Sequence, residues 1–452
     1  MVTISQPMAE RIYWTQMRLR GRGGVRERLA WLRENETLSP AEIDEIQAAK
    51  LRELVRHAST TTPYYAQVLA ERGLTADDIS SVADLAKLPV ITRSILAVNQ
   101  TQLLSNQADA ATLQTNRSSG STGQRAEFSQ DLDFRIWMRA HQLRTYEWCS
   151  DWKLGEPFVL LWGSEIYWNL RQPIERWENR LSNRREFNTF HLSHELVCRF
   201  VDELERFSPV LVSSYSNALH LVVLELERQR RDLGRLRAVQ ATSEPFPPEL
   251  RQRISGALGC EAFDKYGMRE INIVSHESPD HAGMMVQSEN VVVEILDRNG
   301  EPCTPGETGR VVVTSLNNHA MPLIRYETSD VAALLPREPG ALLPFPVMSP
   351  VAGRLQDLIV VPDRGHVDSY FFSYLLMNEP EVHWFQVVQE VPEALVIKLY
   401  APDGLSTQVC ESLAERIRHH TLFPYRIDFE ALDRMPESST GKFRLCISHV
   451  TA

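Results

Sequence analysis

Several short stretches of the chain carry residue types suited to binding a phosphate-bearing ligand. The first is the run Ser118, Ser119, Gly120, Ser121, Thr122 and Gly123. Small hydroxyl residues and glycines let backbone N–H groups converge on an anion such as a phosphate. The run lacks the lysine of a Walker A loop and the spacing of a dinucleotide fingerprint. Taken alone it is more typical of an ordinary loop, so the other stretches matter.

The next stretches supply carboxylates and an aromatic ring. Residues 242–245 (TSEP) are followed by residues 264–270 (DKYGMRE). Tyr266 beside Gly267 offers a flat face with room for a base, and Asp264 could accept a hydrogen bond from an exocyclic amine. Glu270 offers the hard oxygen ligand that Mg²⁺ prefers. A core tyrosine and two surface acids are the alternative interpretation of this stretch.

Three further groups lie nearer the C-terminus. Asp330 closes the strand-like run 321–330 (MPLIRYETSD), where a carboxylate could bind both hydroxyls of a ribose. Arg354 and Gln356 belong to residues 353–357 (GRLQD), where the texture of the sequence changes. Lys442 lies in residues 439–444 (STGKFR), a glycine-containing loop. A lone loop lysine is usually only a solvated charge.

The elements that must position these groups suggest an α/β protein. The short apolar runs 157–162 and 210–212 predict buried strands, and residues 193–207 and 217–230 predict helices. Strands alternating with helices indicate a mainly parallel sheet. Residues 291–296, 309–315 and 332–335 are β-rich and separated by turns, which predicts a small antiparallel sheet or barrel.

The two ends of the chain have patterns of their own. Residues 9–33 are helical and basic but are interrupted by glycines, which favours a solvated helix face over a membrane-surface site. Ser39, Pro40 and Glu42 predict a helix start with a capping box, and that helix should run to about Ala58. Strands at 358–361, 384–389, 394–400 and 426–432 with a helix at 406–419 predict a small α+β domain. We therefore expect a large domain over 1–353 and a small mobile domain over 354–452.

Bulk composition narrows the function classes. The 452 residues exceed one ordinary core, and a net charge of -11 argues against a nucleic-acid binder. The six cysteines are scattered, with no pair spaced for zinc. No secretory h-region and no run of 18 apolar residues occur, so we expect a cytoplasmic protein with no membrane partner. The histidine pairs 191/194 and 276/281 lack a third ligand, and no G-x-S-x-G elbow is present.

Read together and in this order, the stretches resemble the adenylate-forming superfamily of acyl-CoA synthetases, adenylation domains and luciferases. Residues 51–58 (LRELVRHA), 63–65 (PYY) and 84–89 (DLAKLP) resemble the opening of its phenylacetate–CoA ligase branch. The C-terminal part resembles the capsule-biosynthesis relatives of that branch. The resemblance covers nearly the whole chain from about residue 45 and implies ATP, Mg²⁺ and coenzyme A as cofactors.

The resemblance also implies roles for individual residues. The run 118–123 would be the mobile loop around the β- and γ-phosphates. Glu270 would bind Mg²⁺, Asp330 would hold the ribose with Arg354 beside it, and Gln356 would be the hinge. The adenine would be bordered by residues of two stretches, with Tyr266 stacking on the ring and Asp264 near its amino group: Ser243, Glu244, Pro245, Asp264, Tyr266 and Gly267. Lys442 would bridge the carboxylate and the α-phosphate as a mobile point charge.

Four departures from the family pattern affect the expected catalytic cycle. The phosphate loop continues with Gln124, Arg125 and Ala126 where a lysine beside a proline is common. Arg269 replaces a small hydroxyl residue before the Mg²⁺ glutamate, and Gln356 replaces the usual Asp or Lys. Residues 361–366 (VPDRGH) replace the glycine-centred loop that lines the thiol tunnel. The last of these bears on the coenzyme A step more than on adenylation.

Three hypotheses remain open at the level of sequence. The first is an AMP-forming acid–CoA ligase for an aromatic or small acid, monomeric or homodimeric, with a pocket lined by Trp162, Gly163, Tyr215, Phe246 and Met268. The second is an adenylate-forming enzyme whose acceptor is an amine, a hydroxyl or a carrier-protein thiol. The third is a catalytically silent nucleotide-binding member. Retention of Glu270, Asp330 and Lys442 counts against the third.

Overall fold

The computed structural model describes residues 3–117, 127–162, 179–188, 194–354, 359–362, 364–367, 371–372, 375–376, 379, 381–402, 404–436 and 444–450. The chain divides into two compact units. One comprises Ser5–Gly155 and Phe263–Pro350, and the other comprises Met1–Ile4, Glu156–Ala262 and Val351–Ala452. A unit boundary therefore falls close to the predicted domain boundary at residue 353. An independent domain over 354–452 stays a prediction.

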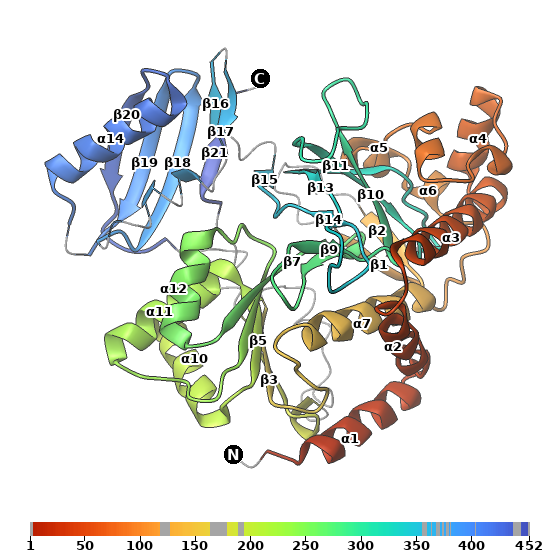
Figure 1. The fold of residues 1–452 in the computed structure, drawn as a ribbon, viewed down its shortest axis with the longest axis horizontal. Coiled ribbons are helices and arrows are strands. Elements are labelled where there is room, and N and C mark those ends of the chain that lie inside the picture. Colours follow the sequence, from red (N-terminus) through yellow and green to blue (C-terminus); the bar gives the residue numbers. More distant parts are fainter. Residues whose placement is uncertain are drawn as a thin grey trace. The chain divides into compact units, whose positions relative to one another are not determined.

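The unit built from residues 5–155 and 263–350 begins with helices (Figure 1). The predicted capping box is confirmed: the Ser39 hydroxyl accepts from the backbone of Glu42, whose carboxylate accepts from the Ser39 N–H. The basic N-terminal segment forms two helices, and its glycines interrupt the helical pattern between Leu19 and Gly24 as predicted. The elements of this segment are α1 (Gln6–Leu19), α2 (Gly24–Asn35), α3 (Pro40–Thr61), α4 (Pro63–Arg72), η1 (Ala76–Asp78), η2 (Ala83–Lys87), α5 (Arg93–Val98), α6 (Gln100–Leu103), β1 (Gln114–Arg117), β2 (Glu127–Gln130) and α7 (Leu132–Glu147).

The later part of the same unit is antiparallel, as the β-rich texture predicts. Strands β7, β8, β9, β14 and β13 pair in that order, and β10, β11 and β12 form a second ladder. Strand β12 runs through the stretch that ends at Asp330, and β13 is shorter than predicted. The strands are β7 (Glu261–Met268), β8 (Asn272–Glu277), β9 (Met284–Val286), β10 (Val291–Leu296), β11 (Gly309–Ser315), β12 (Tyr326–Ala332), β13 (Leu334–Leu335) and β14 (Val347–Met348).

The segment 156–262 of the other unit has the predicted α/β architecture. Strands β4, β3, β5 and β6 pair in parallel, and helices α10, α11 and α12 lie beside them (Figure 1). Every residue of β5 and β6 is buried, as expected where both faces of a parallel sheet are covered. The elements are β3 (Phe158–Trp162), β4 (Arg184–Asn188), α10 (His194–Phe207), β5 (Leu211–Tyr215), α11 (Ser216–Gln229), β6 (Ala238–Thr242) and α12 (Pro248–Leu258).

The C-terminal segment has a hydrophobic core built only from its own residues, between Ile359 and Cys446. Strands β18 and β19 are antiparallel, and β20 and β21 each add in parallel at an edge. The elements are β15 (Gly353–Arg354), β16 (Ile359–Val361), β17 (Gly365–Val367), β18 (Trp384–Val391), β19 (Ala394–Tyr400), α14 (Thr407–Thr421), β20 (Arg426–Ala431) and β21 (Cys446–Ser448). Across the described residues, no helix has the length and apolar character needed to cross a membrane.

Candidate functional site

Two of the predicted nucleotide-binding residues meet in one place. The Tyr266 hydroxyl, from strand β7, donates a hydrogen bond of 2.7 Å to Oδ2 of Asp330 in β12. Asp330 lies inside β12 and not at the end of a strand as predicted. The neighbouring Ser329 has a φ of 66°, a left-handed conformation that non-glycine residues rarely adopt. Such local strain is characteristic of functional sites.

A buried phenol links this pair to Glu270. Tyr326, the first residue of β12, is 1% exposed, and Glu270 is 5% exposed. Burial raises the pKa of Tyr326 to about 12, and the nearby charges of Glu270 and Asp330 add to that rise, whereas Arg93 opposes it. Both predicted carboxylates therefore lie within electrostatic reach of one hydroxyl, in the same unit of the fold.

The turn that carries Glu270 is held by buried amides. The Gln130 side chain, 3% exposed, donates to the carbonyl of Arg269 at 2.8 Å. Asn290, which is fully buried, donates to the carbonyl of Ile273 at 2.8 Å, on the other side of the turn. Asn272, with a φ of 75°, closes the turn and donates to the carbonyl of Met138. These contacts fix the backbone of the turn before any ligand binds.

Among the described residues, the Glu270 carboxylate has no protein partner for its charge. The residue is only 5% exposed, yet none of the described residues forms a hydrogen bond or an ion pair with this carboxylate. A buried carboxylate without a counter-charge is costly, which suits a group that waits for a cation. No cluster of three or more acidic, histidine or cysteine ligands occurs among the described residues. The arrangement fits a metal ion that brings other oxygen ligands with it, as Mg²⁺ on a nucleotide does.

Gly267 has a role that the sequence alone did not indicate. A β-bulge falls between Tyr266 and Gly267, where strand β7 pairs with β8. A Cβ at position 267 would lie 2.3 Å from the carbonyl oxygen of Asn272. Glycine is therefore required at this position, because the backbone of Asn272 approaches it too closely for a side chain. The bulge also shifts the register with β8 between Tyr266 and Gly267.

Residues that sequence reasoning missed hold β12 in place. Ile91 pairs with the start of β12: its N–H donates to the carbonyl of Arg325 at 2.8 Å, and its carbonyl accepts from Glu327 at 2.9 Å. The buried Tyr65 hydroxyl donates to Pro322 and accepts from the N–H of Ile324. Tyr65 of the segment 63–65, and Ile91 just after the segment 84–89, thus anchor the stretch that leads to Asp330. Arg93, two residues after Ile91, reaches the Tyr326 hydroxyl and had no signal in the sequence beyond its charge.

Asp264 and its neighbour lie in the interior of the same unit. Asp264 is 7% exposed, and its backbone N–H donates to the Glu277 carboxylate at 3.0 Å. Burial lowers the pKa of Lys265 to about 8 and that of His276 to about 3. His281 contacts the Glu277 carboxylate at 3.1 Å, and the His276 ring contacts the Glu277 carbonyl at 2.6 Å, so both histidines have protein partners.

The stretch 242–245 belongs to the other unit, where its carboxylate caps a helix. Glu244 Oε2 accepts from the N–H of Asn217 at 3.0 Å and from the Ser216 hydroxyl, at the start of α11. A carboxylate at a helix N-terminus is stabilised by the helix dipole. Ser243 has a φ of 70°, another left-handed non-glycine residue directly after β6. This capping role explains the conformation of the turn without a nucleotide.

The predicted acyl pocket is partly core. Tyr215 and Phe246 are 1% and 2% exposed and belong to the hydrophobic cluster of the α/β segment, with Trp162 packed 4.9 Å from Tyr215 between ring centroids. Met268 is half-buried at the end of β7. Gly163 lies outside the described residues. The pocket assignment stays a prediction.

Several predicted residues cannot be placed. The run 118–123, Gln356 and Lys442 lie outside the described residues, and only the backbone of Arg354 is described, in β15. The strands that flank the run are described, however. Gln130 in β2 donates to the Arg269 carbonyl, and the carbonyl of Ser129 accepts from Asn318 at 3.0 Å. The hairpin β1–β2 is therefore tied to the Glu270 turn.

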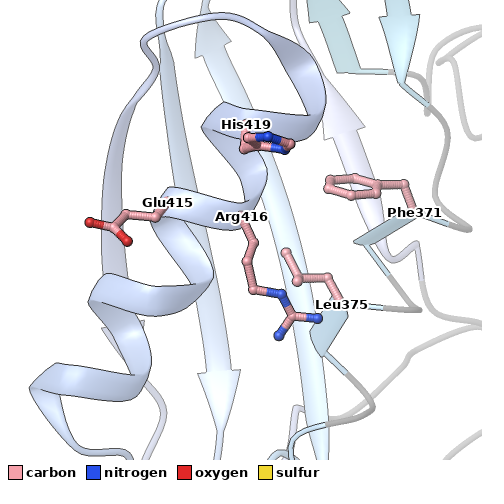
Figure 2. Close-up of a pocket in the computed structure, with 5 residues that line it drawn as sticks. All are labelled: Phe371, Leu375, Glu415, Arg416 and His419. Atoms are coloured by element: carbon pink, nitrogen blue, oxygen red, sulfur yellow. The ribbon is translucent and has the colours of Figure 1, made fainter.

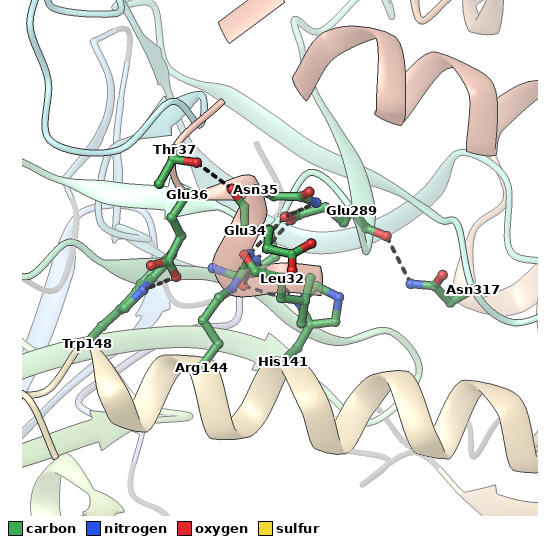
Figure 3. A network of polar contacts seen from close by, with 11 residues as sticks. Leu32, Glu34, Asn35, Glu36, Thr37, His141, Arg144, Trp148, Glu289 and Asn317 are labelled. Atoms are coloured by element: carbon green, nitrogen blue, oxygen red, sulfur yellow. Dashed lines mark hydrogen bonds and ion pairs between the residues drawn. The ribbon is translucent and has the colours of Figure 1, made fainter. Parts of the chain in front are cut away.

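Two other polar groupings could be mistaken for the site. Figure 2 shows a shallow pocket on helix α14 lined by Phe371, Leu375, Glu415, Arg416 and His419, none of which is a predicted site residue. Figure 3 shows a buried network in which the Arg144 guanidinium pairs with the Glu289 carboxylate at 2.8 Å, both side chains being fully buried. The Gln287 side-chain oxygen accepts from Arg144, and the Asn35 side-chain amide donates to Glu289, so both charges of the pair have protein partners.

Comparisons with known proteins show which proteins the chain is similar to. A model of the family described as AMP-binding enzyme matches residues 188–320. The chain is 26% identical over 336 residues to phenylacetate-coenzyme A ligase of Pseudomonas putida, covering 72% of this chain and 74% of that protein. The fold is similar to 2-hydroxyisobutyryl-CoA ligase in its postadenylation state, with a TM-score of 0.76, 15% identity and coverage of 92% and 91%. It is also similar to the amide bond synthetase McbA from Marinactinospora thermotolerans, with a TM-score of 0.50, 18% identity and coverage of 70% and 65%.

Proposed function

We propose that this chain is an AMP-forming acid–CoA ligase, since it belongs to the adenylate-forming AMP-binding enzymes and to their phenylacetate–CoA ligase-like branch. It activates a carboxylic acid with ATP as an acyl-AMP, releases pyrophosphate and transfers the acyl group to coenzyme A. The acid is aromatic or small, in keeping with the phenylacetate acted on by the relatives.

One observation carries the proposal. Glu270 is a buried carboxylate to which no described residue supplies a counter-charge, and it lies within electrostatic reach of the Tyr326 hydroxyl, which the charge of Asp330 also influences. A carboxylate suited to a metal and a carboxylate suited to a ribose, both near one phenol, match the needs of a magnesium nucleotide.

The remaining assignments extend this pair. Mg²⁺ held by Glu270 would neutralise the phosphates and stabilise the leaving pyrophosphate. Asp330, oriented by Tyr266, would accept from the ribose hydroxyls. The residues proposed for the adenine are Ser243, Glu244, Pro245, Asp264 and Tyr266, and those proposed for the phosphates are the run 118–123, Arg354 and Lys442.

The chemical step is a displacement at phosphorus. A carboxylate oxygen of the acid bonds to the α-phosphorus while the bond to the bridging oxygen breaks, and the electron pair leaves with pyrophosphate. Two anions must approach one another, so fixed cations and orientation supply most of the catalysis. Lys442, on a loop, would contact both the acid and the α-phosphate, and rotation about Gln356 would then withdraw it before the thiol attacks.

The acceptor is the less constrained half of the reaction. Residues 361–366 contain the turn of a β-hairpin, in which Val361 pairs with Gly365, in place of a glycine-centred loop. We propose coenzyme A as the acceptor on the strength of the ligase relatives, with an amine, a hydroxyl or a carrier-protein thiol as the alternative. The partners are then small molecules, and a cytoplasmic site of action follows from the supply of ATP and coenzyme A there.

A pyrophosphate-release screen tests the proposal. The purified chain is incubated with magnesium-ATP and a panel of aromatic and short aliphatic acids, each with coenzyme A, with a primary amine, and with neither. We expect acid-dependent pyrophosphate release for at least one acid and a thioester only in the coenzyme A arm. An amide product with no thioester would move the assignment to the alternative acceptor.

Lys442→Ala supplies the matched control for the assignment of half-reactions. It should suppress acid-dependent pyrophosphate release yet spare thioester formation from pre-made acyl-AMP. Gln356→Pro should do the reverse, because it stiffens the hinge and slows only the second half-reaction. Absence of pyrophosphate release with every acid, together with no binding of magnesium-ATP in calorimetry, would refute the proposed function.

A further inference from the structure

Glu270 occupies the middle of a hairpin loop whose last two residues are buried. Met268 in β7 pairs with Asn272 in β8, so the loop consists of residues 269–271. Glu270 is 5% exposed and Ile271 is 0% exposed, whereas loops between strands usually run over the protein surface. Water cannot reach the backbone groups of a buried loop, so other parts of the protein must supply their hydrogen-bond partners.

Buried amide side chains supply these partners on both sides of Glu270. The Gln130 amide donates to the carbonyl of Arg269 at 2.8 Å. That carbonyl belongs to the same planar peptide group as the Glu270 nitrogen, so the bond restrains the peptide directly before Glu270. After Glu270, the Asn290 amide donates to the carbonyl of Ile273 at 2.8 Å. The backbone that carries the carboxylate is therefore held from two directions.

Gln130 reaches the loop from a fixed position at the end of β2. The carbonyl of Ser129 accepts from the Asn318 side chain at 3.0 Å. Asp131 is the N-cap of helix α7, and its Oδ2 accepts from the N–H of Ala320 at 3.1 Å. Both chain neighbours of Gln130 are thus tied to other elements of the same unit, and the Gln130 side chain extends from a rigid base.

The side-chain oxygen of Gln130 has a partner of its own. It accepts from the Asn116 amide in β1 at 2.9 Å. Asn116 lies opposite Phe128 in the register of the hairpin, so Asn116 and Gln130 form a diagonal pair on one face of the two strands. An amide oxygen can only accept and an amide nitrogen can only donate. The contact with Asn116 therefore fixes which way the Gln130 amide points, and with it the donor to Arg269.

A second buried glutamine of the same unit holds a strand instead of the loop. Gln47 in α3 is 7% exposed, compared with 3% for Gln130, and donates to the carbonyl of Val291 in β10 at 2.7 Å. The two glutamines have similar burial and form a similar hydrogen bond to a backbone carbonyl. They differ in whether the peptide group that they hold carries the candidate metal ligand.

We propose that Gln130 is a positioning residue for the Glu270 carboxylate, acting through the peptide group of Arg269 and oriented by Asn116. This inference rests on the proposed function, in which Glu270 binds the magnesium of magnesium-ATP. Residues that orient a metal ligand contribute to metal affinity although they do not touch the metal. Without the Gln130 bond, the peptide before Glu270 loses this restraint, and the carboxylate spends less time aimed at the metal.

Calorimetry on substituted chains tests this assignment. Gln130→Met removes both hydrogen bonds at similar side-chain volume, and it should weaken binding of magnesium-ATP about tenfold. Its binding of AMP without metal should be unchanged, because that ligand does not use the Glu270 carboxylate. Asn116→Ala removes only the orienting contact and should weaken magnesium-ATP about threefold. Gln47→Met is the matched control and should bind magnesium-ATP as the wild type does, even if its melting temperature falls as far as that of Gln130→Met.

A double substitution shows whether the two bonds act in series. Asn116→Ala combined with Gln130→Met should bind magnesium-ATP no more weakly than Gln130→Met alone. Losses that multiply in the double variant, equal weakening in Gln130→Met and Gln47→Met, or equal weakening of AMP would overturn the assignment.

Two further outcomes separate this inference from the proposed function. If Gln130→Met does not fold, Asn116→Ala, at a half-buried position, decides the question by whether it weakens magnesium-ATP more than AMP. If the wild-type chain binds no magnesium-ATP, the proposed function and the Gln130 assignment fail together. Binding by the wild type that Gln130→Met leaves unaffected overturns the Gln130 assignment alone.

Discussion

Glu289 and Glu270 are two buried glutamates of the same unit, and they differ in what surrounds them. Glu289 is fully buried. It forms an ion pair with Arg144 and accepts a hydrogen bond from the Asn35 side chain, within the network drawn in Figure 3. Glu270 is nearly as buried, yet across the described residues no cation and no donor reaches its carboxylate. The comparison indicates that burial of a charge is structural when the fold supplies the counter-charge, and functional when the counter-charge must be bound.

Loss of the enclosed carboxylate should produce the largest effect. Glu289→Ala leaves the Arg144 guanidinium buried without its anion, and we expect the free energy of unfolding to fall by about 3–5 kcal/mol. Denaturant melts of the full chain measure this. Glu147 lies on helix α7, as Arg144 does, and Glu147→Ala breaks its more exposed ion pair with Arg33. This substitution should lower the free energy of unfolding by less than about 1 kcal/mol. Similar losses in both variants would show that the network is not the internal support inferred from its burial.

Loss of the open carboxylate should act on catalysis instead. Glu270→Gln removes the charge that would hold magnesium, and we expect adenylation to slow about 100-fold with a shifted magnesium dependence. Its melting temperature should not fall, because an uncompensated buried charge has been removed. Glu289→Gln is the matched control, with stability lowered and adenylation per folded molecule retained. Unaltered turnover of Glu270→Gln would show that the metal assignment is wrong.

The two glutamates should also separate in their response to acid. Arg144 and its hydrogen bonds lower the pKa of Glu289 from its usual value of 4.5 to about 2, against the opposing effect of burial. A depressed folded-state pKa stabilises the fold above the unfolded value, and that stability is lost as pH falls from about 4.5 toward 2. Between about pH 4.5 and 2, the free energy of unfolding should fall steeply with pH in the wild type and less steeply in Glu289→Gln. An unchanged acid limb in the variant would contradict the linkage.

Prediction from the sequence succeeded where a local rule governs and stopped where packing does. The Ser39 capping box and the parallel strands β3 and β5 follow from local patterns, and the structure confirms them. The pairing of Tyr266 with Asp330 joins residues 64 positions apart, which no periodicity reveals. The resemblance to the family placed both residues in one site, but it did not indicate that Tyr326 lies near the charges of Glu270 and Asp330. Gly267 was predicted only to leave room for a base, and the structure adds that the close approach of the Asn272 carbonyl also requires the lack of a Cβ there.

The smallest expected effect concerns the hydroxyl that orients Asp330. Tyr266→Phe keeps the ring but removes its 2.7 Å hydrogen bond to the carboxylate, and we expect ATP affinity to fall about fivefold, or roughly 1 kcal/mol. Isothermal titration with ATP and with an ATP analogue lacking the ribose hydroxyls checks the cause. If Asp330 binds the ribose, the substitution should weaken ATP but leave the analogue unchanged, because the analogue never uses the oriented carboxylate. Equal weakening of both would assign Tyr266 to the base, through stacking disturbed by the loss of its anchor, and would leave Asp330 without the ribose role.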